Sequence, residues 1–236
     1  MEPTITTIPL SGVNCYLLRQ DNNFILCDTG GPLIFDKVFD NRREELIREL
    51  EKQGCCKGNL KLILLTHGDN DHVANAAFLR KTFDAPIGMH KDDLFLVNKP
   101  SMEAILINFN SRYIVINSIA KVIKKKFTKV LQHTLDEFES FLPDFYFEEG
   151  DELLSYGIDG KIFHLPGHTP GSIGVLTSQG GLIAGDTLQN VKKPGAATNA
   201  QDFKTLNKSI QKLEGMKILK AYPGHGKPFS YHKHAK

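Results

Sequence analysis

The sequence predicts an α/β fold in which helices pack on β-sheets, and three observations support this prediction. Short apolar segments typical of strands alternate with amphipathic segments typical of helices after an initial hairpin. Each half of the chain is strand-rich first and helical afterwards, which favours a sandwich built from two similar halves. No linker rich in Pro, Gly or Ser divides the chain, so we expect a single domain over residues 1–236.

Composition excludes several classes of function. The chain has 236 residues, 41% of them apolar, which is enough for a substantial core. The net charge of +2 does not indicate a nucleic-acid partner. No apolar run approaches the roughly 18–20 residues that span a bilayer, and the N-terminus lacks the pattern of a secretory signal. We interpret the four cysteines as reduced thiols and expect a cytoplasmic protein without a membrane partner.

The first half is expected to begin with three strands and to continue as alternating helices and strands. The opening strands cover residues 4–8, 13–19 and 23–27, and a turn joins the last two as a hairpin. Apolar residues at helical spacing predict one or two helices over residues 35–53, closed by Gly54. The run at residues 60–65 predicts a buried strand, followed by a helix over 73–83 and a strand over 86–89.

Residues 91–144 lack the strand rhythm and are predicted to form a helical insertion that covers the site. Residues 114–131 alternate apolar residues with lysines. We favour a solvated helix face over a surface for an anionic partner or membrane, because nearby acidic residues offset the charge. Five phenylalanines are expected to be partly buried here: Phe127, Phe138, Phe141, Phe145 and Phe147.

In the second half, glycines accompany a potential metal ligand at three strand ends. The expected strands cover residues 153–156, 161–165, 173–177, 181–184 and 218–222, and a helix covers 203–213. His168 lies in PGHTPGS, Asp186 in AGDT and His225 in PGHG. Each motif alone is typical of a turn. All three in one chain indicate loops that turn sharply and approach an ion closely.

The strand over residues 60–65 ends in THGDNDH, which places four potential metal ligands within six residues. These are His67, Asp69, Asp71 and His72. A buried strand end presents side chains rigidly, and imidazole with carboxylate suits zinc, iron or manganese. A polar turn before a helix is the alternative. The number and spacing of the ligands favour a metal site.

THGDNDH resembles the signature loop T-H-x-H-x-D-H of the metallo-β-lactamase superfamily. The opening strands that end in DTGG are similar to the start of that family, and PGHTPGS resembles its glyoxalase II-like branch. With AGDT and PGHG, the resemblance covers nearly the whole chain except the insertion. It implies a four-layer αββα sandwich with a helical insertion.

The resemblance also implies two divalent metal ions, zinc or iron with manganese as a further candidate. The first site would use His67, Asp69 and His168, the second Asp71, His72 and His225, and Asp186 would bridge them. Asp71 would also act in catalysis by orienting the attacking water. Asp28, Thr66 and Thr169 would support the ligands from behind, although Asp28 also fits a turn residue that bonds its own backbone.

Asp69 departs from the family pattern, which has histidine there. Aspartate is shorter and charged, so the first metal would lie closer to the backbone, bind through a water, or bind weakly. An oxygen ligand also shifts preference from zinc towards iron or manganese, and flavodiiron proteins of the superfamily carry a glutamate there. An aspartate in a surface turn is the alternative. Lys192 and Lys193 are interpreted either as an anion-binding pair for the substrate or as plain surface lysines.

The leading functional hypothesis is a hydrolase in which a metal-bound hydroxide attacks a small ester-like substrate, with a thioester favoured. The first alternative is hydrolysis of a phosphodiester or lactone. A di-iron redox protein that reduces oxygen or nitric oxide is a second alternative, although this chain has no flavin domain to supply electrons. A third is a binding protein that kept the fold and lost turnover. The sequence does not predict the oligomeric state.

Overall fold

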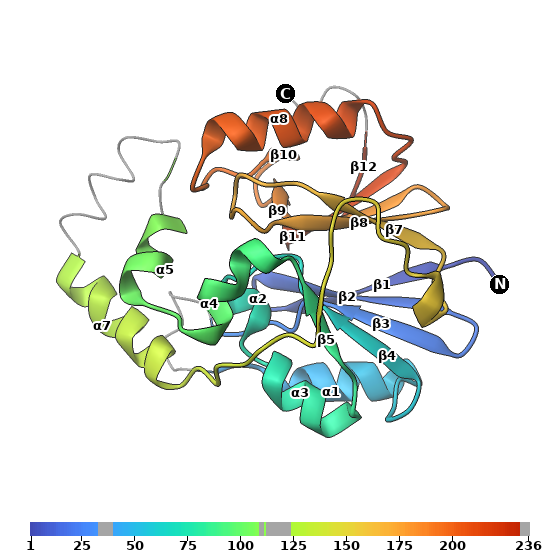
Figure 1. Cartoon of the computed structure of the whole chain (residues 1–236), viewed down its shortest axis with the longest axis horizontal. Coiled ribbons are helices and arrows are strands. Elements are labelled where there is room, and N and C mark those ends of the chain that lie inside the picture. The colour runs from blue at the N-terminus through green and yellow to red at the C-terminus, as the bar shows by residue number, and fades with distance from the viewer. Residues whose placement is uncertain (33–39, 109–110, 112–123, 232–236) are drawn as a thin grey trace.

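A computed structural model of the chain describes residues 1–32, 40–108, 111 and 124–231, and these residues contain two β-sheets that pack face to face (Figure 1). The first sheet contains, in spatial order, β1 (Thr4–Leu10), β2 (Val13–Gln20), β3 (Asn23–Cys27), β4 (Leu60–Leu64), β5 (Ile87–Met89) and β6 (Phe145–Tyr146). The second contains β12 (Phe229–Ser230), β11 (Lys220–Gly226), β9 (Gly181–Asn190), β8 (Ile173–Thr177) and β7 (Gly160–His164), with β10 (Gly195–Ala196) paired to β9.

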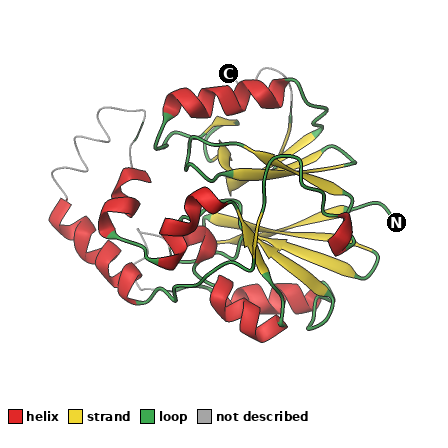
Figure 2. Cartoon of the chain, viewed as in Figure 1, coloured by secondary structure: helices red, strands yellow, loops and turns green. Residues whose placement is uncertain are grey.

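Helices cover the outer faces of both sheets. The described helices are α1 (Arg43–Lys52), α2 (Asn70–Val73), α3 (Ala76–Phe83), α4 (Leu94–Asn98), α5 (Met102–Asn108), α7 (Lys124–Asp136) and α8 (Phe203–Glu214), with short 3₁₀ helices η1 (Lys91–Asp93) and η2 (Leu154–Tyr156). Helix α8 lies over the second sheet, whereas α1 and α3 lie under the first (Figures 1 and 2). The order helix, sheet, sheet, helix confirms the predicted α/β fold and its αββα sandwich.

The central strands of the first sheet, β2, β3 and β4, are mostly buried on both faces, which explains why their sequences are largely apolar. Along β2, Cys15 and Leu17 point into the core beneath α1 and α3, while Tyr16 and Leu18 point into the core between the sheets. A third cluster, which includes Leu213 of α8, fills the space under that helix. Burial on both faces fixes the register of these strands, because a slip of one residue would move every side chain from one core to the other.

Parallel pairing brings several strand ends to one edge of the molecule. Strands β3, β4 and β5 run parallel to one another in the first sheet, and β9 runs parallel to β11 in the second. In open α/β sheets, binding sites form beyond the carboxyl ends of such strands. The segments that follow β3, β4 and β5, together with the ends of β9 and β11, are therefore the places where this fold presents functional side chains.

Most predicted elements are confirmed, and one strand is wrong. Each of the other predicted strands overlaps an observed strand, and the limits differ by one or two residues where the prediction extends beyond it: 4–8, 13–19, 23–27, 60–65, 86–89, 161–165, 173–177, 181–184 and 218–222. The strand predicted at residues 153–156 is instead the 3₁₀ helix η2 together with Leu153, the residue before it. The chain turns back there because Gly157 adopts a positive φ of 79° and Tyr156 N–H donates to the carbonyl of Leu153.

Two predicted helices differ from the observed ones in their limits. Helix α1 begins only at Arg43, and residues 33–39 of the prediction lie outside the described residues. The helix predicted over residues 73–83 is observed as α3, which begins only at Ala76, and Val73 instead ends α2. Between the two helices, the Asn75 side chain donates to the backbone carbonyls of Thr29 and Asn41. The helix predicted over 203–213 is confirmed as α8, and the Asp202 carboxylate caps it by accepting from two backbone N–H groups.

The region predicted as an insertion contains η1, α4, α5 and α7, which lie together at one side of the sandwich (Figure 1). Residues 114–123 of the basic segment lie outside the described part of the chain. Phe138, Phe141 and Phe147 are buried or half-buried as expected. Phe145 is exposed instead, because it lies on the two-residue edge strand β6. Among the described helices, none has the length and apolar character needed to cross a bilayer.

Candidate metal centre

The segment that follows β4 contributes four of the seven predicted ligands. His67 lies in the turn, Asp69 takes the extended N-cap position of α2, and Asp71 and His72 lie within that helix. Gly68 fits between them because a Cβ there would approach the Cβ of Leu96 to 2.6 Å. A turn this tight brings both imidazoles and both carboxylates to the same strand end.

The first group of side chains consists of His67, Asp69 and His168. Their potential ligand atoms all lie within 4.8 Å of one another. Asp69 Oδ2 is 3.0 Å from His168 Nε2 and 3.8 Å from His67 Nε2. This is the first set that the family resemblance implied, and the shorter aspartate side chain still reaches both histidines.

The second group consists of Asp71, His72 and His225, again with ligand atoms within 4.8 Å of one another. Asp71 Oδ2 is 3.5 Å from His225 Nε2 and 3.9 Å from His72 Nε2. Asp71 and His225 have about a quarter of their side-chain surface exposed, at 26% and 24%, whereas His72 is fully buried. The centre is therefore open on the side of Asp71 and His225.

Asp186 lies between the two groups, at β9. Its Oδ2 is 3.7 Å from His168 Nε2 in the first group and 3.2 Å from His225 Nε2 in the second. Its Oδ1 is 3.4 Å from His72 Nε2. The structure thus brings together all seven residues, although they are distributed between positions 67 and 225 of the chain.

Each of the four histidines has its Nδ1 atom fixed from behind. The Nδ1 of His72 is 2.9 Å from Asp28 Oδ2, and that of His67 is 2.9 Å from the Thr66 hydroxyl. The Nδ1 atoms of His168 and His225 donate to the carbonyls of Asn199 and Gly12. This arrangement points every Nε2 atom inward, as in protein metal sites where an outer partner orients the ligand ring.

Asp28 and Thr66 form one hydrogen-bonded unit behind the histidines. The Asp28 carboxylate accepts from both the N–H and the hydroxyl of Thr66, at 2.8 Å each. Asp28 itself adopts a positive φ of 61°, which turns the chain sharply after β3. The two interpretations of Asp28 in the sequence therefore describe one residue, which both makes the turn and contacts His72.

Buried atoms without hydrogen-bond partners indicate that this cluster fits a cation. Among the described residues, the inner atoms His67 Nε2, His72 Nε2 and Asp186 Oδ1 are buried and make no hydrogen bond. Leaving such atoms unsatisfied is costly, and native proteins rarely do so. Divalent ions bound by these lone pairs would satisfy all three atoms, so the donor set fits the ions that the family resemblance implied.

The charges in the centre shift the pKa values of its histidines in opposite directions. Burial lowers the pKa of His67 to about 3, and neighbouring His72 adds to this effect. Burial also disfavours the charged form of His72 and His225, but Asp186 and Asp71 together outweigh it and raise their pKa values to about 9 and about 10. Burial opposes the charged form of His168 too, but Asp69 and Asp186 together raise its pKa to about 9. A metal ion that binds here must displace protons from three imidazoles.

Asp93 is a buried carboxylate that the sequence analysis missed. It accepts hydrogen bonds from Gly68 N–H, the Thr169 hydroxyl and Gly171 N–H. Thr169 therefore contacts Asp93 and Ser172 rather than a histidine, so any support it gives to the ligands is indirect. Burial raises the pKa of Asp93 to about 6, against these three hydrogen bonds. The only signal in the sequence was a pair of aspartates shortly after a strand.

His90 and His164, interpreted from the sequence as structural, stack on each other. Their ring centroids are 4.1 Å apart with planes 11° from parallel, and Asp92 lies 3.7 Å from His90 Nδ1. Two histidines and an aspartate form a potential metal set. Imidazole lone pairs lie in the ring planes, and nearly parallel planes do not meet at one ion. The stacked pair is thus a packing contact in this arrangement.

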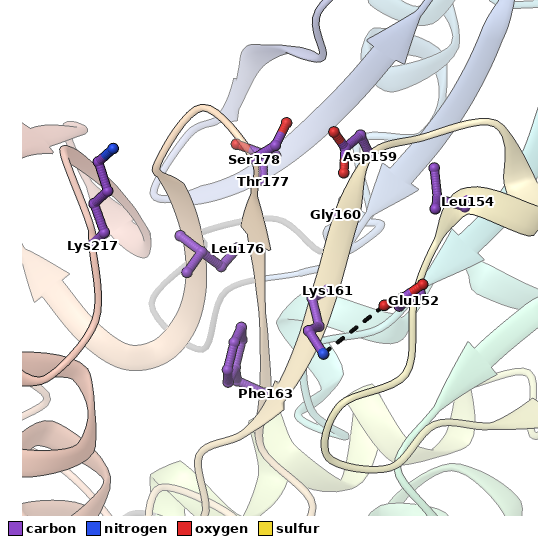
Figure 3. Close-up of a pocket in the computed structure, with 10 residues that line it drawn as sticks. All are labelled: Glu152, Leu154, Asp159, Gly160, Lys161, Phe163, Leu176, Thr177, Ser178 and Lys217. Atoms are coloured by element: carbon purple, nitrogen blue, oxygen red, sulfur yellow. Dashed lines mark ion pairs between the residues drawn. The ribbon is translucent and has the colours of Figure 1, made fainter.

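Neither Lys192 and Lys193 nor the surface cavities extend the candidate centre. Both lysines are exposed on the segment between β9 and β10, and their predicted role with a substrate stays a prediction. A cavity of about 330 Å³ is lined in part by Lys161 and Glu152, which form an ion pair at 4.0 Å (Figure 3). None of the seven clustered side chains lines this cavity.

Comparisons with known proteins agree with the fold and with the family that the sequence resembles. The family profile described as Metallo-beta-lactamase superfamily matches residues 8–225. The hydroxyacylglutathione hydrolase GloC of Haemophilus influenzae is 30% identical over 213 residues, which cover 88% of this chain and 82% of GloC.

Two solved structures show the same fold at lower sequence identity. The metallo-beta-lactamase family protein TTHA1429 from Thermus thermophilus superposes with a TM-score of 0.71 at 21% identity, over 97% of this chain and 74% of that one. TTHA1623, solved in a di-iron-bound form, superposes with a TM-score of 0.63 at 23% identity, over 96% and 94%.

Proposed function

The chain belongs to the metallo-β-lactamase superfamily, and we propose that this metallohydrolase cleaves a small thioester with two divalent metal ions. The convergence of seven side chains, with three inner atoms buried and unpartnered, is the observation that carries the proposal. The choice of a thioester is supported by GloC, whose name describes hydrolysis of an acylglutathione. Phosphodiesters and lactones are the alternative substrates, because the same centre stabilises the charge that develops in their hydrolysis.

In the proposed mechanism the open side of the centre receives the substrate. The cations that the two groups and Asp186 would hold would supply an acidified water as the nucleophile and would neutralise the charge that develops on the attacked group. Asp71 lies at the open side and is half-buried, so its carboxylate is placed to orient the attacking water and hold its proton. The buried imidazoles of His67, His72 and His168 are held from behind and keep the centre rigid.

We propose that Asp69 binds the first ion directly. Its carboxylate reaches within 3.0 Å of His168 Nε2, so one ion would contact both side chains without a bridging water. A carboxylate in place of an imidazole raises the preference for iron or manganese relative to zinc. Elemental analysis of protein purified without added metal identifies the ion, and an absorption band of an oxo-bridged iron pair would favour the alternative redox function.

A panel of substrates tests the proposed reaction. We expect thioesters of small acyl groups to be hydrolysed faster than lactones or phosphodiesters, because GloC is the relative that suggests the substrate. The measurement is kcat/KM for each class with the metal-loaded protein. Faster turnover of a phosphodiester or lactone would replace the thioester while keeping the hydrolase. Absence of turnover on every class, together with reduction of oxygen or nitric oxide, would reject the hydrolase.

Metal loading is expected to depend on pH because protons and ions compete for the same nitrogen atoms. The pKa values of His72 and His168 lie at about 9 and that of His225 at about 10, so all three carry protons at neutral pH before metal binds. Apparent affinity should therefore rise as pH increases from about 6 to about 8, with protons released on binding. Calorimetry in two buffers of different ionisation enthalpy measures that release. Affinity that does not change with pH would contradict the expectation.

A further inference from the structure

We propose that Asp93 is a positioning residue that holds the first group, His67, Asp69 and His168, in shape for its ion. This inference rests on the proposed function, because it assumes that the centre binds two metal ions. Asp93 does not belong to either group, and its carboxylate is completely buried.

Asp93 connects the two loops that carry the first group. Its Oδ2 accepts from Gly68 N–H at 2.8 Å, and Gly68 lies between His67 and Asp69 in the chain. The same oxygen accepts from the hydroxyl of Thr169, the residue after His168, at 2.6 Å. One oxygen atom thus fixes the distance between the two loops.

The second oxygen of Asp93 holds the far side of the PGHTPGS loop. Its Oδ1 accepts from Gly171 N–H at 2.7 Å, and a Cβ at Gly171 would approach that oxygen to 2.7 Å. The close approach shows that the loop backbone packs directly against the carboxylate. An ionised carboxylate that accepts three hydrogen bonds is a strong and rigid connection.

A second contact from the same segment strengthens this connection. His90, three residues before Asp93, stacks on His164, and His164 Nε2 donates to the Pro170 carbonyl at 2.9 Å. The segment from His90 to Asp93 therefore holds the PGHTPGS loop at two places. Both contacts act on the loop that carries His168.

The second group is held by different residues. The loop that carries His225 accepts from Asn14 Nδ2 at the carbonyls of Pro223 and Gly226, and from the Tyr16 hydroxyl at Pro223. These contacts come from β2, and none of them involves Asp93. The loop that carries His168 and the loop that carries His225 are therefore held by different side chains, and it is possible to weaken each loop alone.

Replacing Asp93 with asparagine tests the inference with minimal change in shape. Asparagine has one carbonyl oxygen and one NH₂ group, so at least one of Gly68 N–H and Gly171 N–H loses its acceptor. We expect affinity for one of two Zn²⁺ ions to fall by about 10- to 100-fold, with the other unchanged, since outer partners of metal ligands have effects of this size. Competition with a chromophoric chelator measures both dissociation constants.

Tyr16→Phe is the matched control, because it removes only the hydroxyl that donates to Pro223. In Co²⁺-loaded protein, Asp93→Asn should change the visible absorption of one ion and Tyr16→Phe that of the other. Thr169→Val removes one of the three hydrogen bonds to Asp93. It should affect the same ion as Asp93→Asn, with a smaller loss of affinity. If Asp93→Asn does not fold, Thr169→Val provides the test in its place.

The outcomes separate this inference from the proposed function. Wild-type protein that binds at most one Zn²⁺ would reject the two-ion centre itself. Wild-type protein that binds two ions, with Asp93→Asn binding both at unchanged affinity, would reject the role of Asp93 alone. An equal loss of both ions would also reject it, because a general loss of stability does not distinguish the two groups.

Discussion

Asp186→Ala is expected to lower kcat/KM by about 10³-fold or more and to reduce the bound metal. Asp186 is the only one of the seven clustered residues placed between the two groups, since its oxygens lie 3.2 to 3.7 Å from His72, His168 and His225. Removing the carboxylate leaves buried imidazoles that repel one another once protonated, and it removes the residue proposed to be shared by both ions. The measurement is kcat/KM on the best thioester, with metal content determined on the same sample.

Asp186→Asn separates charge from shape in this experiment. Asparagine keeps the volume of the side chain but removes the negative charge that holds the pKa values of His72 and His225 high. We expect activity close to that of the alanine variant, because an amide is a poor ligand for a shared ion. Wild-type rates in both variants would show that the reaction takes place elsewhere in the molecule.

Gly224→Ala is expected to lower activity by about 10²-fold, although it changes no proposed ligand. A Cβ at Gly224 would lie 2.0 Å from Asp186 Oδ1 and 2.8 Å from His72 Cε1, so both side chains would have to move. A displacement of about 1 Å in a catalytic centre has an effect of this size. The measurement is again kcat/KM, together with the dissociation constants of both ions.

Gly195→Ala provides the matched control for this variant. A Cβ at Gly195 meets no heavy atom within 4 Å, and its backbone is not in the left-handed region. Activity and thermal stability should therefore remain within error of the wild type. Equal effects of the two substitutions would show that contact with Asp186 does not explain the loss in Gly224→Ala.

The sandwich and the seven clustered residues could be predicted because both produce recognisable patterns over short stretches of the sequence. Continuous apolar runs such as residues 60–65 identify strands that are buried on both faces. THGDNDH concentrates four polar side chains at the end of such a strand. The shared pattern of glycine beside His168, Asp186 and His225 marks sharp turns at other strand ends, and the family resemblance connected them.

The supporting contacts were not predictable, because they depend on residues distant in the chain. Asp93 accepts from Gly171, which is 78 residues away, and nothing near Asp93 in the sequence reports this contact. The limits of local signals also explain the error at residues 153–156. Leu153 and Tyr156 are apolar enough for a strand, but a backbone hydrogen bond between them closes a 3₁₀ turn before Gly157.

The hydrogen bond between His225 and the Gly12 carbonyl has a consequence for when the protein can bind its metal ions. The two residues are 213 positions apart, and the hydrogen bond between them is 2.6 Å long. During synthesis, His225 is added 213 residues after Gly12, so the second group lacks this imidazole until then. Contacts between such distant residues form late in folding. We therefore expect ions to be captured fully only after His225 has been added, so that shorter nascent chains gain little stabilisation from them.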